Sequence, residues 1–279
     1  GLHGMGGEID NTLPIYAELL GEYGFAYATI DGVAHGSRSL GGQPQLEIFK
    51  LSDLRFARDA FRQTLSDLYR FRQSMTAGVV IDRVPIAQTG IRWTGGSYGG
   101  IFGVMMSAFD EELEAAHVEG CGGPWSTILA DSNMYEVVKL VFAGHAELGK
   151  ADHALVDRAA HRFLELGQWL FDAGDPVGLA HQLTSRAQRP RMLMQYWVGE
   201  PVMPNSASVR LERAIGLPQN QAAHDSAGVW GVWGYDLEAW GVKPGNDDAH
   251  QSYWKIPEAR AQAIQFLVSH GTEIHEPGG

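Results

Sequence analysis

The sequence predicts an α/β protein in which a mostly parallel sheet is flanked by helices. Short segments rich in β-branched and aromatic residues alternate with longer segments that have helical spacing of apolar residues, and this alternation is typical of parallel sheets with right-handed crossovers. A block of helical character at 125–186 interrupts the alternation, as a cap over the carboxyl ends of the strands would. The length of 279 residues fits one large α/β domain with such an excursion.

The elements of the first half follow from apolar spacing and from capping and breaking residues. Helical spacing begins at Leu13 and stops at Gly24, and Ser52 or Asp53 can cap a long helix that runs to about Met75. The glycine- and serine-rich segment 33–45 is expected to be a loop. Strands are expected at 25–30, 90–94 and 114–121, and a buried helix at 101–109.

In the second half, strand character returns after the helical block. Pro257 is expected to begin a last helix that runs to about His270, since proline is favoured at a first helical position. The remaining expectations are a strand at 191–197, an amphipathic helix at 206–215 and a last edge strand pair at 228–240. We therefore predict three parts, namely core at 1–124, helical cap at 125–186 and core at 187–279.

Composition excludes several classes of partner. The formal net charge of −12 argues against binding to nucleic acid or to an anionic membrane surface, because phosphate binding needs a basic face. Cys121 is the one cysteine, so the chain has no intrachain disulfide and no thiolate metal cluster. No run approaches the roughly 20 apolar residues that span a bilayer. No signal peptide is visible, and the expected soluble protein could be cytoplasmic or secreted after processing.

Residues 94–100 contain a G-x-S-x-G pattern centred on Ser97. The segment before it has strand content, and the segment after it is apolar and free of proline, as a buried helix would be. Such a tight strand-to-helix turn holds the serine in strained backbone angles and lifts its hydroxyl clear of the sheet. Glycines on both sides avoid collisions with the neighbouring chain. This context predicts that Ser97 is a nucleophile, with a plain glycine-rich turn as the alternative.

A serine nucleophile needs a histidine to accept its proton and a carboxylate to orient that histidine. In chain order the acid should follow a strand after the helical block. Glu200 meets this condition, because it lies in a polar turn directly after the strand predicted at 191–197. Asp172 and Asp175 are the alternatives, but both belong to the helical block.

The histidine should lie in a loop before the last helix. His250 does so, in the polar segment 245–252, and it is the predicted general base. His224 is the main alternative, whereas His270 and His275 come too late, in or after the last helix.

The reaction also needs an oxyanion hole, which consists of two N–H groups directed at the developing negative charge. The position of Tyr98 after the serine makes its N–H one donor. The second donor should come from a glycine-rich loop after an earlier strand, and the segment 2–7 is such a loop. We predict Met5 N–H as this second donor.

Several segments together resemble the α/β-hydrolase superfamily across essentially the whole chain. Within it, the IDGVAHGSR segment is similar to bacterial lipases and esterases of the virulence-factor type. The resemblance implies a Ser-acid-His triad that acts on carboxylic esters, on Ser97, Glu200 and His250. It rests on HGMGG at 3–7, IDGVAHGSR at 30–38, GGSYGG at 95–100, GDP at 174–176, GEPVMPN at 199–205 and His250.

The chain departs from the family pattern at two points. Glutamate stands at 200, where the family usually has aspartate, and its extra methylene changes the geometry. The strands that normally precede the HG loop are absent, and Gly1 to Gly4 resemble the end of a strand whose body is missing. A sheet without these strands exposes a new edge, which a second copy of the chain could cover as a homo-oligomer.

The sequence therefore predicts a serine esterase or lipase that needs no cofactor and no metal and acts on a small ester or lipid. A structural hydrogen-bonding role is favoured for His35 over a metal site shared with His3, since no carboxylate or cysteine completes a ligand spacing. Amide or peptide hydrolysis and acyl transfer use the same triad and remain open. A binding protein with this fold but without catalysis is the alternative outside enzymes.

Overall fold

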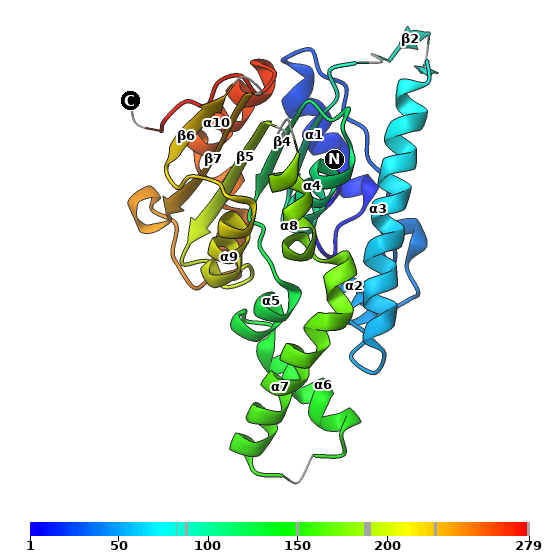
Figure 1. Cartoon of the computed structure of the whole chain (residues 1–279), viewed down its shortest axis with the longest axis vertical. Coiled ribbons are helices and arrows are strands. Elements are labelled where there is room, and N and C mark those ends of the chain that lie inside the picture. The colour runs from blue at the N-terminus through cyan, green and yellow to red at the C-terminus, as the bar shows by residue number, and fades with distance from the viewer. Residues whose placement is uncertain (82, 87–88, 149–150, 187–190, 226–227, 278–279) are drawn as a thin grey trace.

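A five-stranded sheet forms the centre of the molecule (Figure 1). The computed structural model describes residues 1–81, 83–86, 89–148, 151–186, 191–225 and 228–277, apart from the side chains of 45–46, 84, 224–225 and 247. The strand order is β3-β4-β5-β7-β6, with β6 antiparallel to β7 and the other neighbours parallel. The strands are β3 (Arg92–Gly96), β4 (Ala115–Glu119), β5 (Arg191–Val198), β6 (Gln221–Asp225) and β7 (Gly228–Asp236), with a separate hairpin of β1 (Val80–Ile81) and β2 (Val84–Pro85).

Helices cover both faces of this sheet. The side chains of β5 contribute to a core on each face, because alternate residues of a strand point to opposite faces. Met192 and Met194 join the core on the side of α3 (Leu54–Thr76), α4 (Tyr98–Phe109), α8 (Pro176–Ser185) and α9 (Asn205–Ile215). Leu193 and Trp197 join the core on the side of α1 (Ile9–Gly21), η4 (Asp247–Trp254) and α10 (Pro257–Val268). A strand buried on both faces accounts for the mostly apolar sequence of β5, which only Gln195 interrupts between Met192 and Val198.

The helical block between β4 and β5 begins at Trp125, whose side chain is fully buried. Its indole donates to Gly174 O at 2.9 Å, and its amide donates to Asp175 Oδ2 at 2.7 Å, so the start of the block is tied to the turn between η2 (Asp172–Gly174) and α8. In Figure 1, α6 and α7 extend away from the sheet. The predicted division into core, cap and core stays a prediction. The block comprises α5 (Trp125–Asp131), α6 (Tyr135–His145), α7 (His153–Phe171), η2 (Asp172–Gly174) and α8, and the remaining short helices are η1 (Gly36–Arg38), α2 (Pro44–Ile48) and η3 (Glu238–Trp240).

Most predicted elements are confirmed, and two are wrong. The segment 25–30 forms no strand, because it has no ladder partner among the described residues. Part of it lines a cavity of about 630 Å³ that residues 89–94 and the end of α3 also line. The segment 228–240 is not an edge pair, since β7 lies between β5 and β6 and only β6 is at the edge. Among the described strands, β3 forms the other edge, and its coverage by a second copy stays a prediction.

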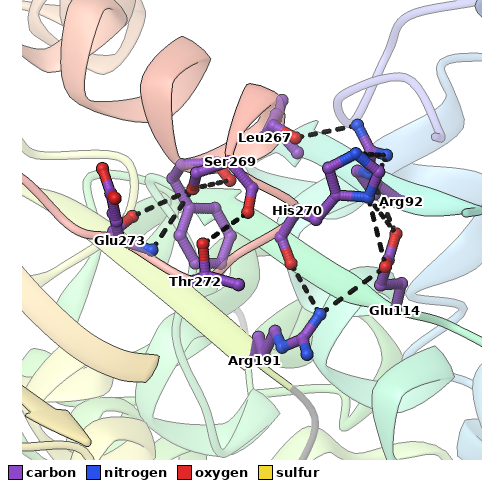
Figure 2. Close-up of polar contacts among 9 residues, drawn as sticks. Arg92, Glu114, Arg191, Leu267, Ser269, His270, Thr272 and Glu273 are labelled. Atoms are coloured by element: carbon purple, nitrogen blue, oxygen red, sulfur yellow. Dashed lines mark hydrogen bonds and ion pairs between the residues drawn. The ribbon is translucent and has the colours of Figure 1, made fainter. Parts of the chain in front are cut away.

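A cluster of charged side chains lies at the edge of the sheet where β3 and β5 begin (Figure 2). Arg92 donates to Leu267 O at 2.9 Å and pairs with Glu114 at 3.2 Å, while Arg191 donates to His270 O at 2.8 Å. His270 Nδ1 lies 3.1 Å from Glu114 Oε2. These contacts hold the end of α10 against the sheet, at the opposite ends of the strands from Ser97. Among the described residues, no helix combines the length and apolar content needed to cross a membrane.

A buried row of polar side chains connects the strands beneath the α10 face. His117 on β4 accepts from the Thr94 hydroxyl at Nδ1 (2.9 Å) and donates from Nε2 to Gln195 Oε1 (3.0 Å). Gln195 in turn donates to Gln262 of α10 at 2.7 Å. Burial lowers the pKa of His117 to about 4, so the imidazole is neutral near pH 7 and these contacts fit the tautomer protonated at Nε2.

Stability is expected to fall as the pH decreases from about 6.5 to about 4. In this window the unfolded chain protonates residue 117 while the folded chain does not, so the unfolded state binds more protons and acid favours it. Over this pH window, the titration of His117 is expected to lower the free energy of unfolding by about 3 kcal/mol. Urea unfolding at several pH values should show a weaker pH dependence for His117→Gln than for the wild type. Equal dependence would contradict the prediction.

Candidate active site

The turn between β3 and α4 presents Ser97. Its backbone angles, φ 54° and ψ −120°, lie in a region that residues with a Cβ rarely occupy. The Ser97 amide donates to Glu119 O at 2.8 Å, which fixes the turn against the end of β4. The predicted elbow is thus present, with a strained serine between a parallel strand and a buried helix.

Glycines flank Ser97 because neighbouring groups approach too closely for a side chain. A Cβ at Gly96 would overlap Glu119 Oε1, and one at Gly99 would overlap Leu2 O. The second contact places the N-terminal loop directly on the first turn of α4. A Cβ at Gly4 would lie 3.8 Å from Ser97 Cβ, so this loop also borders the serine.

Glu200 and His250 form a close pair, although 50 residues separate them in the chain. His250 Nδ1 lies 2.9 Å from Glu200 Oε1 and 3.0 Å from Oε2. The carboxylate is buried, follows β5 directly and also accepts from Val202 N at 3.0 Å. Because an ionised carboxylate only accepts, the Nδ1 of His250 carries the proton, and its Nε2 is left as the basic nitrogen.

The end of β4 lies close to both the serine and the Glu200–His250 pair. Glu119 O holds the Ser97 amide, and a Cβ at the next residue, Gly120, would lie 3.6 Å from His250 Cε1. The turn at Ser97 and the imidazole of His250 therefore both lie next to the segment 119–120. The structure brings the three predicted residues Ser97, Glu200 and His250 to one end of the sheet.

The segment 4–7 forms a tight turn beside Ser97, closed by a bond from Gly7 N to Gly4 O at 3.0 Å. Gly6 has φ 81°, as the third position of a type II turn requires. Met5 lies in this turn, and Tyr98 is the first residue of α4, where an amide has no partner within the helix. Their roles as oxyanion donors stay predictions.

His3 connects that turn to the segment around Gly32. Its Nδ1 donates to Gly4 O at 2.8 Å, and its Nε2 accepts from Gly32 N at 3.0 Å, so one neutral tautomer satisfies both contacts. Burial lowers the pKa of His3 to about 4. His35 packs against it at 4.7 Å between ring centroids and bonds Val33 O at 2.9 Å, which agrees with the structural role predicted for it.

Asp31 has a role that the sequence reasoning missed. Its two carboxylate oxygens accept from Ile9 N at 3.0 Å and from the amide and hydroxyl of Ser37, both at 2.8 Å. Although burial opposes it, these bonds hold the pKa of Asp31 below its usual value. Asp31 thereby ties the segment 30–38 to α1. The Asp-Gly pair at 31–32 was a signal for a side chain that organises a turn.

The alternative acids have other roles. Asp175 caps α8 by accepting from Val177 N at 2.8 Å, and Asp172 accepts from Gln168 at 2.9 Å. The side chain of His224 lies outside the described part of the chain.

The sequence reasoning also assigned nothing to Glu119. The residue is buried, at 7% exposure, and burial raises the pKa of its carboxyl group to about 7. The same pKa is lowered by His250 and raised by Glu200, so both residues of the pair act on it.

Comparison with solved structures shows that the chain has the α/β-hydrolase fold, as predicted. It is similar to acetyl xylan esterase from Paenibacillus sp. R4, with a TM-score of 0.62 and 16% identity over 96% of this chain and 72% of that one. It is also similar to acetyl xylan esterase 1 from Thermoanaerobacterium sp. JW/SL YS485, with a TM-score of 0.56 and 16% identity over 96% and 73% of the two chains. No protein-family model and no curated protein sequence matches the chain.

Proposed function

We propose that the protein is a serine hydrolase that cleaves carboxylic esters with Ser97, His250 and Glu200 as its triad. The observation that carries the proposal is the contact of both Glu200 oxygens with His250 Nδ1, at 2.9 and 3.0 Å, at the end of the sheet where the strained serine lies. This arrangement orients the basic nitrogen of the imidazole and stabilises the imidazolium that forms when it takes a proton.

In the proposed reaction, Ser97 Oγ attacks the ester carbonyl while His250 Nε2 removes the hydroxyl proton. The carbonyl oxygen becomes negative and accepts from the amides of Tyr98 and Met5. The imidazolium then gives its proton to the leaving alcohol, and an acyl group remains on Ser97. Water attacks this acyl-enzyme with His250 again as base, which releases the acid and restores the serine.

The proposed substrates are small or lipid-like esters. This choice rests on the resemblance of the IDGVAHGSR segment to virulence-factor-type lipases, since the triad alone does not separate ester from amide chemistry. That segment contacts the N-terminal loop, because Gly32 N donates to His3 Nε2 at 3.0 Å, so the resemblance concerns a segment beside the proposed oxyanion donor Met5.

Labelling with a fluorophosphonate probe tests the proposal. We expect one covalent adduct on Ser97, found by peptide mass mapping, because the probe reacts with serines that a neighbouring base activates. A panel of p-nitrophenyl esters and matched anilides should then show faster turnover of the esters. No adduct on Ser97 would favour a binding protein with this fold, and faster anilide turnover would make the protein an amidase.

A further inference from the structure

Glu119 lies against the turn that presents Ser97. It is the last residue of β4, its backbone oxygen holds the Ser97 amide at 2.8 Å, and its Oε1 rests against Gly96. By strand alternation its side chain shares the face of Ala115 and His117, which belong to the α1 and α10 side of the sheet. The carboxyl group therefore approaches the elbow from the buried side.

The titratable groups that face Glu119 come from four directions. His250 and Tyr253 belong to η4, Glu200 follows β5, Tyr16 belongs to α1, and Cys121 follows β4. Of these, only the imidazole can carry a positive charge. Among the described residues, no lysine or arginine forms an ion pair with Glu119. Among these titratable groups, His250 is the one that can balance the charge of Glu119, and Glu200 contacts it as well.

We propose that Glu119 is a positioning residue for the base, because its carboxyl group acts on His250 from the buried side and its charge sets the pH range in which the imidazole is a neutral base. The inference rests on the role proposed for His250. It adds a second carboxyl group to the pair formed by Glu200 and His250.

The sign of the effect follows from electrostatics. An ionised Glu119 stabilises the imidazolium and so raises the pKa of His250. Burial raises the pKa of Glu119 to about 7, and repulsion from the Glu200 carboxylate adds to this rise, while His250 opposes it. Glu119 therefore gains its proton near neutral pH, in the range where a histidine base titrates, and the two titrations are coupled.

Replacing Glu119 with glutamine tests the proposal, since it removes the charge and keeps the size. We expect the midpoint of the His250 titration to fall by about half a pH unit or more. The measurement is an NMR titration of ¹³C-labelled histidine, with His250 assigned by comparison with His250→Asn. It needs no turnover, so it gives a result even if the protein proves not to be an esterase.

Glu212→Gln is the matched control, because Glu212 is also a buried carboxyl group with a raised pKa but lies on α9. Its replacement should leave the His250 midpoint unchanged. Glu119→Asp keeps the negative charge but moves it farther from His250, so it should lower the His250 midpoint by a smaller amount. This variant replaces Glu119→Gln in the test if Glu119→Gln does not fold. Where esters are cleaved, the acid limb of kcat/KM should move with the midpoint. Equal midpoints in the wild type and the Glu119 variants would overturn the proposal.

Discussion

Ser97→Ala is expected to abolish hydrolysis of short p-nitrophenyl esters, with kcat lower by on the order of 10⁵-fold or more. The hydroxyl would be the sole nucleophile of the proposed reaction, so its loss leaves only the oxyanion donors and substrate binding to act on the ester. The measurement is initial rates at saturating substrate near pH 8, where the histidine base is neutral.

Ser107→Ala provides the control for this substitution. Ser107 is a buried serine on α4, the same helix that Ser97 precedes, and its hydroxyl bonds Gly103 O at 2.8 Å within the helix. Its loss should leave ester turnover close to that of the wild type. Substantial turnover in Ser97→Ala, or an equal loss in both variants, would show that the elbow serine is not the nucleophile.

The parts of the site that the sequence predicted are those that local chemistry specifies. Ser97 is marked by glycines that the close approach of Leu2 and Glu119 requires. Glu200 follows a strand recognisable by its apolar run, and His250 precedes a helix that proline begins. Their chain order and their places after a strand and before the last helix were the grounds for expecting them together, because parallel strands place their carboxyl ends at one edge of the sheet.

Features that depend on distant contacts could not be predicted in this way. The segment 25–30 has strand composition, but a strand also needs a partner, and a cavity lies along part of it. The position of β7 inside the sheet depends on β6, a short polar segment without a strand signal. Glu119 was part of a predicted strand, and its nearness to His250 arises from pairing and loop placement that no local pattern encodes.

Asp110→Ala is expected to lower the free energy of unfolding by about 3–5 kcal/mol. Asp110 is fully buried at the end of α4, and Arg72 of α3 contacts both of its oxygens at 2.6 Å. Arg72 is itself nearly buried, and after removal of the Asp110 carboxylate its one remaining carboxylate contact among the described residues is with the exposed Glu112, so its charge is only partly compensated. Urea unfolding followed by circular dichroism measures the loss.

The double variant Arg72→Met with Asp110→Leu distinguishes this cause from simple loss of packing. Because the cost of Asp110→Ala comes from a buried charge that Glu112 compensates only in part, replacing both Arg72 and Asp110 by apolar side chains should recover most of the stability. Asp59→Ala, which breaks the exposed pair with Arg58, should change stability little, since solvent screens that pair. If the double variant were as unstable as Asp110→Ala, the pair would act through shape rather than charge.

The pair also joins α3 to α4, the helix that begins at the elbow, so Asp110→Ala should reduce labelling of Ser97 only where it unfolds the chain.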